Sequence, residues 1–171
     1  MSTLVDHEIA SWAHKGGVQP FDLEMVNPAT INLRVGNSAK IEGPWGLIDV
    51  DLGKYSERLP YVVPPRGWIL TSTLEWVAIP TDMAGEVMLR SSAARRGWDH
   101  HKAGFIDPGW NGILTLEFVN CLGMTGLPIY PGLELVQMKL EMLQSTPSKN
   151  YRETGRYHGA TTVEQCKDDR L

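Results

Sequence analysis

The chain has 171 residues and a formal charge of −4, the size of one domain. Without a basic excess it is a poor candidate for binding a nucleic-acid polymer, although a local basic cluster could hold one small phosphorylated ligand. Its 17 glycines and 11 prolines predict many turns between short strands rather than a helical bundle.

The N-terminus has neither the basic segment nor the apolar segment of a signal peptide, and no apolar run reaches the length of a membrane span. The two cysteines, Cys121 and Cys166, form no CxxC pair and are expected to be plain thiols in a reducing compartment. The sequence therefore predicts a cytoplasmic protein with no membrane partner.

A short helix is expected first. Asp6 can cap it, Ile9 and Trp12 give it an apolar face, and Gly16-Gly17 ends it. Its expected role is to pack over a sheet.

Strands follow the helix. In residues 29–36, Ile31, Leu33 and Val35 share one face, and Asn32 and Arg34 share the other, as in a half-buried strand. Turn signals then recur every 8 to 12 residues or so, which is typical of all-β proteins. Further strands are expected over 61–63, 68–71, 74–79, 85–90, 112–119 and 133–142.

Two segments interrupt this pattern. Residues 91–97 predict a short helix that leaves a strand end, where free backbone N–H groups and basic side chains could hold an anion. A solvated basic helix face with a serine cap is the alternative. The groups concerned are Arg90, Ser91, Ser92, Arg95 and Arg96. Residues 144–171 are polar and predict a tail that follows a domain of residues 1–143, with disorder as one possible state.

A carboxylate in an apolar strand is the strongest chemical signal. Glu117 shares its face with Ile113, Thr115 and Val119, so it is expected to be at least partly buried. Burial disfavours the charged form of an unpaired carboxyl, and that environment suits a general acid/base. A structural glutamate with a satisfied partner is the alternative. The Asp107-Pro-Gly-Trp110 turn just before this strand predicts either simple turn chemistry or part of a site.

The run Asp99-His100-His101-Lys102 places two imidazoles near that turn. Adjacent histidines on a strand point in opposite directions and no third ligand is evident, so one histidine lining a pocket is expected rather than a metal site. The zinc deaminase signature, H-x-E followed by P-C-x-x-C, is absent from the sequence.

Taken in order, these blocks resemble the dCTP deaminase branch of the dUTPase-like superfamily. The blocks are residues 29–36, 90–97 and 103–120, then Pro131-Gly132 with Gln137, and Gly155-Arg156-Tyr157 in the tail. The resemblance implies a mainly β fold, a distorted β-barrel or jelly roll with a short N-terminal helix and a flexible C-terminal tail. It also implies a homotrimer with active sites between subunits, over which the tail closes.

The resemblance implies a role for each matched residue. Glu117 would be the general acid/base, Ser91 would orient the attacking water, and Arg95 would support charge near C4 of the cytosine. Ser92, Gln137 and Arg156 would face the phosphates, Trp110 would pack on the deoxyribose, and Asp107 would hold its 3′-hydroxyl. No zinc is implied, and Mg²⁺ would arrive on the triphosphate. The other residues expected at the substrate are Arg90, His100, Lys102, Ala103, Gly104, Tyr151 and Tyr157.

Glu117 favours deamination of dCTP or a 5-modified dCTP over a dUTPase-only activity, because plain dUTPases generally carry an apolar residue there. Ala103-Gly104 resembles the bifunctional members, which continue from dUTP to dUMP and pyrophosphate. The alternatives are a dUTPase alone and a non-catalytic nucleotide-binding member. Two departures from the family pattern support the last: Lys102 replaces a usual Thr, and a tail Gln is missing near Ala160. A third departure, Asn32 in place of a usual Asp, bears on the details of substrate binding.

Overall fold

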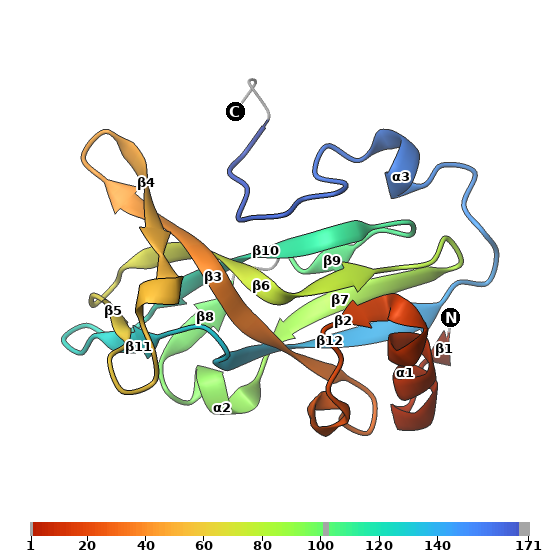
Figure 1. Cartoon of the computed structure of the whole chain (residues 1–171), viewed down its shortest axis with the longest axis horizontal. Helices are drawn as coiled ribbons and strands as arrows, with labels where there is room; N and C mark the ends of the chain where they lie inside the picture. The colour runs from red at the N-terminus through yellow and green to blue at the C-terminus, as the bar shows by residue number, and fades with distance from the viewer. Residues whose placement is uncertain (1, 101–102, 168–171) are drawn as a thin grey trace.

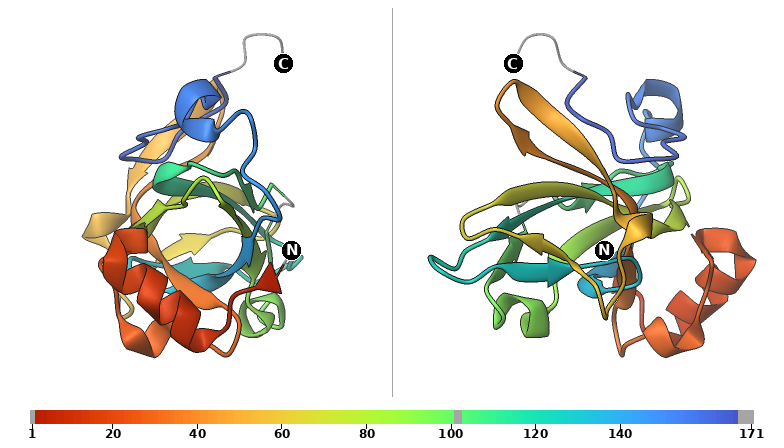
Figure 2. Two further views of the ribbon diagram at one scale, coloured as in Figure 1. Left: turned by 90° about the vertical axis from the view of Figure 1, so that its right-hand side faces the viewer. Right: turned by 60° about the vertical axis from the view of Figure 1, so that its left-hand side comes forward.

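Most of the predicted strands join a single antiparallel sheet. The computed structural model describes residues 2–100 and 103–167, and within them ten strands form this sheet (Figure 1). Its main order is β8-β10-β6-β3-β12-β7-β9, while β1, β2 and β4 pair with β12, β6 and β3, and β5 and β11 form a separate pair. The sheet curls on itself like an open barrel (Figure 2).

The strands have the following bounds: β1 Ser2–Thr3, β2 Val18–Gln19, β3 Ile31–Gly43, β4 Gly46–Asp51, β5 Tyr61–Val63, β6 Trp68–Ala78, β7 Met83–Leu89, β8 Trp98–His100, β9 Phe105–Ile106, β10 Asn111–Asn120, β11 Leu127–Ile129 and β12 Glu134–Met142. The α-helices are α1 Asp6–Trp12, α2 Ser91–Ala94 and α3 Tyr151–Thr154. None of the described helices is long and apolar enough to cross a membrane.

Alternation in the sequence positions the core. On β3, Ile31, Leu33 and Val35 are fully buried, as the pattern predicts. On β10, Leu116 and Phe118 face the same core, so Glu117 between them points to the opposite side of the sheet. This alternation is what carries the carboxylate out of the core and onto a face where a ligand can reach it.

The N-terminal helix α1 forms where expected, but its cap differs from the prediction. The N-cap is Val5, and Glu8 supplies the capping oxygen by accepting a hydrogen bond from the Val5 N–H at 2.9 Å. Asp6 is instead the first helical residue. The chain leaves the helical segment at Gly16, whose φ of +93° lies in the left-handed region that glycine tolerates.

Two other boundaries differ. The strands predicted over 68–71 and 74–79 are one continuous strand, β6, and the helix predicted over 91–97 narrows to the four residues of α2. The hairpin of β3 and β4 extends away from the sheet and carries Trp45, which is fully exposed, near its tip (Figure 1).

The described part of the tail lies against the sheet. It passes over β10 after α3 (Figure 1), and the Ile113 N–H donates to the Ala160 carbonyl at 2.8 Å. Val163 is 4% exposed, and its N–H donates to the Ser38 hydroxyl. Apolar burial and backbone hydrogen bonds therefore dock this segment on the outer face of β10.

Candidate functional site

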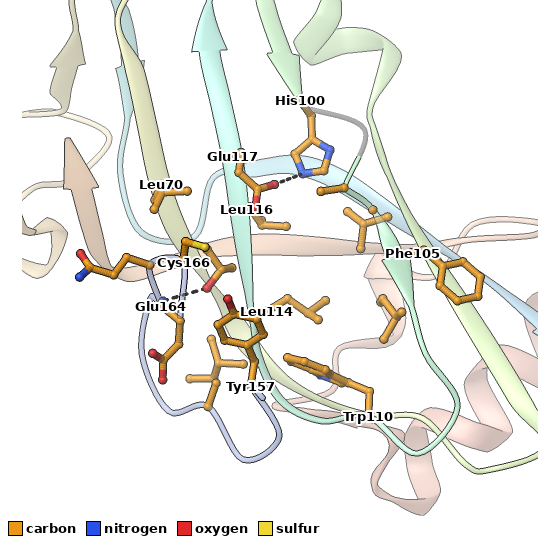
Figure 3. A pocket seen from close by; sticks show the side chains of 18 of the residues that line it. Leu70, His100, Phe105, Trp110, Leu114, Leu116, Glu117, Tyr157, Glu164 and Cys166 are labelled. Atoms are coloured by element: carbon orange, nitrogen blue, oxygen red, sulfur yellow. Dashed lines mark hydrogen bonds and ion pairs between the residues drawn. The ribbon is translucent and has the colours of Figure 1, made fainter. Parts of the chain in front are cut away.

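A cavity of about 520 Å³ lies where the curled sheet fails to close. Strand β10 lines one side, β7 and β9 line the other, and the tail forms a third wall (Figure 3). Most of its lining is apolar, and a few polar groups converge on it, as in small-molecule sites generally. The lining residues used below are His100, Gly104, Asp107, Trp110, Thr115, Glu117, Tyr151, Tyr157 and Glu164.

Glu117 and His100 meet at one end of this cavity. The Glu117 side chain is 25% exposed, and its Oε2 atom lies 3.9 Å from Nε2 of His100, whose side chain is 4% exposed (Figure 3). His100 stands on β8 directly across from Phe118 and packs against that ring, with ring centres 5.4 Å apart. A carboxylate beside an imidazole in a largely apolar cavity is an arrangement suited to proton transfer.

The Asp107 turn forms another part of the wall. Its Trp110 N–H donates to the Asp107 carbonyl at 3.1 Å, and Gly109 takes a φ of +84°, so a glycine is required between them. The Trp110 side chain is buried and packs against Tyr151 with ring centres 5.1 Å apart. Asp107 itself is exposed. The structure thus brings Asp107, Trp110 and Glu117 to one cavity.

The tail reaches the same cavity through hydrogen bonds to β10 and to itself. The Glu164 N–H donates to the Thr115 hydroxyl at 3.0 Å, and the Tyr157 N–H donates to the Tyr151 hydroxyl at 3.3 Å. Tyr151 and Tyr157, both expected at the substrate, line the cavity, whereas Arg156 does not. Burial raises the pKa of the Tyr151 hydroxyl, so it is a neutral hydrogen-bonding group near pH 7.

A second, smaller cavity of about 280 Å³ lies beside α2. Arg90, Ser92 and Arg96 line it, together with residues around Gly132 and with Glu134 at the start of β12. Two guanidinium groups and a hydroxyl make it suitable for an anion. Neither Ser91 nor Arg95, both exposed, lines the cavity that holds Glu117. Within one chain, the predicted site residues therefore do not form a single site: Glu117 lines the first cavity, Arg90 and Ser92 line the second, and Ser91 and Arg95 line neither.

Residues 3–143 match the family model described as dCTP deaminase-like. The chain belongs to this family. It is 34% identical over 178 residues to the protein named "dCTP deaminase, dUMP-forming" of Methanopyrus kandleri, covering 93% of this chain and 92% of that one. It is 37% identical over 155 residues to the dCTP deaminase of Pyrococcus horikoshii, covering 90% and 92%.

The fold of a dCTP deaminase agrees with the structure. The crystal structure of 2′-deoxycytidine 5′-triphosphate deaminase from Agrobacterium tumefaciens superposes with a TM-score of 0.68 at 22% identity, covering 82% of this chain and 47% of that one. The family and the mainly β fold predicted from the sequence blocks are thus confirmed.

The backbone of Gly104 lies so close to β7 that only a residue without a side chain fits at this position. A Cβ atom built there would lie 2.2 Å from the Val87 carbonyl oxygen. The Gly104 carbonyl also accepts the Val87 N–H at 2.7 Å, so the loop is tied to β7 on the cavity wall. Ala103 lines the cavity beside it. Lys102, also expected at the substrate, lies outside the described residues.

Gln137 does not reach either cavity. Its Oε1 accepts a hydrogen bond from the Thr30 hydroxyl at 3.1 Å on the outer face of β3 and β12. Conversely, sequence reasoning does not assign a role to Thr115 or Glu164, which line the first cavity. The role of Thr115 could have been predicted, because it shares one face of the alternating strand with Glu117. The position of Glu164 could not, because it depends on how the tail docks on β10 and not on the local sequence.

Proposed function

We propose that the protein deaminates dCTP by hydrolysis, with Glu117 as the general acid/base and without zinc. The observation that carries this proposal is the partly exposed Glu117 carboxylate in an otherwise largely apolar cavity. The dCTP deaminase family of the chain supports the substrate. A 5-modified cytosine would undergo the same chemistry at C4.

The proposed reaction converts dCTP and water to dUTP and ammonia. Glu117 accepts a proton from the water as its oxygen bonds to C4 of the cytosine ring. The same carboxyl then protonates the ring at N3, takes the remaining water proton from the C4 hydroxyl and passes it to the amino group, so that C4=O forms as the C4–N bond breaks and ammonia leaves. His100, 3.9 Å away, faces the carboxyl through this cycle. Trp110 would pack on the deoxyribose and Asp107 would hold the 3′-hydroxyl.

The division of the site supports a homotrimer with active sites between subunits. Glu117 lines one cavity, whereas Arg90 and Ser92 line another. In the proposed trimer, Ser91 and Arg95 of one copy orient the water and support charge beside Glu117 of the next, because cyclic symmetry presents the same two surfaces at each contact. The phosphates, with their Mg²⁺, would then meet Arg90 and Ser92. The tail of residues 144–171, including Arg156, would close over the bound nucleotide.

We also propose that the product continues to dUMP and pyrophosphate. The dUMP-forming activity named for the Methanopyrus kandleri relative supports this second step. In it, Asp107 would activate a water that attacks the phosphate chain, a role that its exposed carboxylate on the cavity wall permits.

One product assay tests both steps. Incubation with dCTP and Mg²⁺, followed by chromatography, should yield dUMP and pyrophosphate without accumulation of dUTP. Accumulation of dUTP would contradict the second proposal, hydrolysis to dUMP, and would still support the first, deamination of dCTP. Release of pyrophosphate from dUTP, with no deaminated product from dCTP or its 5-substituted analogues, would overturn the deaminase proposal in favour of a dUTPase.

Complementation tests the division of the site between copies. Glu117→Gln and Ser91→Ala chains, each inactive alone, are unfolded and refolded together in equal amounts. A quarter of the interfaces should join two intact halves, so activity should return to about one quarter of the wild-type value. No recovery in refolded mixed trimers would refute a site shared between copies. Light scattering should report three copies per particle.

A further inference from the structure

A chain of polar side chains links β3 and β12 to Arg90. Asn32 is 6% exposed, and its Nδ2 donates to Oε2 of Glu134 at 2.8 Å. Nη1 of Arg90 donates to the same Glu134 oxygen at 2.5 Å. On the far side of Asn32, Nδ2 of Asn27 donates to Oδ1 of Asn32 at 2.9 Å.

The chemistry of these groups determines the direction of each hydrogen bond. A carboxylate only accepts, so Glu134 needs a donor at position 32, and the Asn32 amide provides one. The Oδ1 of Asn32 is already engaged by Asn27, which leaves its Nδ2 to face Glu134. The buried Asn32 therefore holds the Glu134 carboxylate in one orientation.

Glu134 in turn restrains the Arg90 guanidinium at Nη1 and leaves its other N–H groups available to a ligand. The Arg90 backbone N–H donates to the Leu135 carbonyl at 2.9 Å, and Nη1 is held by the side chain and the carbonyl oxygen of Glu134. Among the residues that the structure describes, the Nε and Nη2 groups of Arg90 make no hydrogen bond. A guanidinium has five N–H donors, so three remain for a phosphate.

We propose that Glu134, held by Asn32, is a positioning residue that fixes the Arg90 guanidinium for the triphosphate of the nucleotide. This inference rests on the proposed function, because it assigns the cavity of Arg90, Ser92 and Arg96 to the phosphates. Glu134 neutralises one positive charge there, and Arg96 keeps the group of charged side chains lining the cavity net positive. A guanidinium held in place loses less rotamer freedom when the ligand binds.

The test changes the residues of this hydrogen-bond network one at a time and measures the affinity for dCTP rather than the rate of its turnover. Glu134→Leu removes the acceptor from a side chain that is 30% exposed, and Asn32→Asp sets two carboxylates against each other. Each should weaken the calorimetric Kd of dCTP about tenfold, since a hydrogen bond to a charged group is lost. The Kd of 2′-deoxycytidine, which has no phosphate, should stay within about twofold.

A double variant provides the rescue. When Asn32→Asp is combined with Glu134→Gln, the amide introduced on β12 can donate to the carboxylate introduced on β3, while its oxygen accepts from Arg90. The dCTP Kd should then return to within about threefold of wild type. Glu141→Gln, on the same strand β12 and away from both cavities, is the matched control.

Two results would overturn the inference. One is an unchanged dCTP Kd in folded Glu134→Leu, and the other is an equal loss for dCTP and 2′-deoxycytidine, which would show a merely structural role. If Asn32→Asp does not fold, Glu134→Leu decides alone. Failure of the proposed function is distinguishable, because it would appear as wild-type protein that binds dCTP without deaminating it.

Discussion

Replacing Glu117 by glutamine removes the proton-transferring group at almost constant shape. The Glu117 side chain is only 25% exposed and has Nε2 of His100 3.9 Å from its Oε2 atom, a contact that an amide of the same length can keep. The folded structure and the cavity should therefore be preserved. We expect the Kd of dCTP to stay within about threefold and the free energy of unfolding within about 0.5 kcal/mol.

The loss should fall on the chemical step. A general acid/base contributes roughly 10²- to 10⁴-fold, and each tenfold is about 1.36 kcal/mol of activation free energy, so the barrier should rise by about 2.7–5.4 kcal/mol. Single-turnover conversion of dCTP, followed by chromatography, measures this without interference from product release. Glu141→Gln controls for the loss of one carboxylate elsewhere on the chain.

Retention of the wild-type single-turnover rate in Glu117→Gln would refute the assignment. It would mean that another group moves the protons and that Glu117 only shapes the cavity. A large loss of dCTP affinity would contradict the expectation that the glutamine keeps the shape of the site.

Two further changes test the packing around the first cavity, and a third tests the ionisation of a buried carboxyl elsewhere in the fold. Gly104→Ala should lower the free energy of unfolding by about 1–3 kcal/mol in urea denaturation, because its Cβ would meet the Val87 carbonyl; unchanged stability would contradict this clash. Val163→Ala should weaken docking of the tail by about 1–2 kcal/mol, measured by faster hydrogen exchange there, whereas equal exchange would show that Val163 does not anchor it. Burial raises the pKa of Glu75 above its ordinary 4.5 in spite of Arg34, so the folded state holds the Glu75 proton more tightly than the unfolded state. The free energy of unfolding of wild type should therefore fall, relative to that of Glu75→Gln, as pH rises from about 4.5 through the raised pKa; a difference that is constant over this range would argue against the shift.

The strands can be predicted where alternation is clean and not where buried polar residues break it. Ile31, Leu33 and Val35 indicate β3 directly. The sequence pattern divides the continuous strand β6 because Thr71, Ser72 and Thr73 resemble a polar interruption, yet all three are buried. Their burial depends on partners far away in the sequence. The Thr73 hydroxyl, for example, accepts the N–H of Leu114 at 3.0 Å.

The strand β4 cannot be predicted from the sequence because its residues are exposed rather than buried. Nearly all of its residues are exposed, so it carries no alternating apolar signal, and only its pairing with β3 makes it a strand. Strands as short as β8 and β9 also lack enough residues to show a period.

The site is predictable where one sequence block builds it. Asp107, Trp110 and Glu117 belong to one turn and the strand that follows, so their convergence on one cavity follows from local structure. Gln137 is assigned to the phosphates from the resemblance alone, and its bond to Thr30 depends on the register between β12 and β3.

The departure at Asn32 has a physical explanation in the same register. The resemblance leads us to expect Asp at this position, but in this chain Glu134 presents its carboxylate to residue 32. An Asp there would place two carboxylates about a hydrogen-bond length apart, which is unfavourable unless one is protonated. Asn32 and Glu134 are therefore best understood as a matched pair.

The division of the site follows from the order of the strands. Arg90 leaves the end of β7, and Glu117 lies on β10, which stands near the opposite end of the sheet order from β7. The curl of the sheet opens the Glu117 cavity between β10 and β9, whereas Arg90 and Arg96, which lie on either side of α2, line the second cavity beside β12. A dCTP molecule has its base and its triphosphate at opposite ends, so a second copy that brings its α2 to the Glu117 cavity would supply both ends with complementary groups. In the proposed trimer, assembly would complete the catalytic site, and a separated single chain should bind the nucleotide weakly and leave it unreacted.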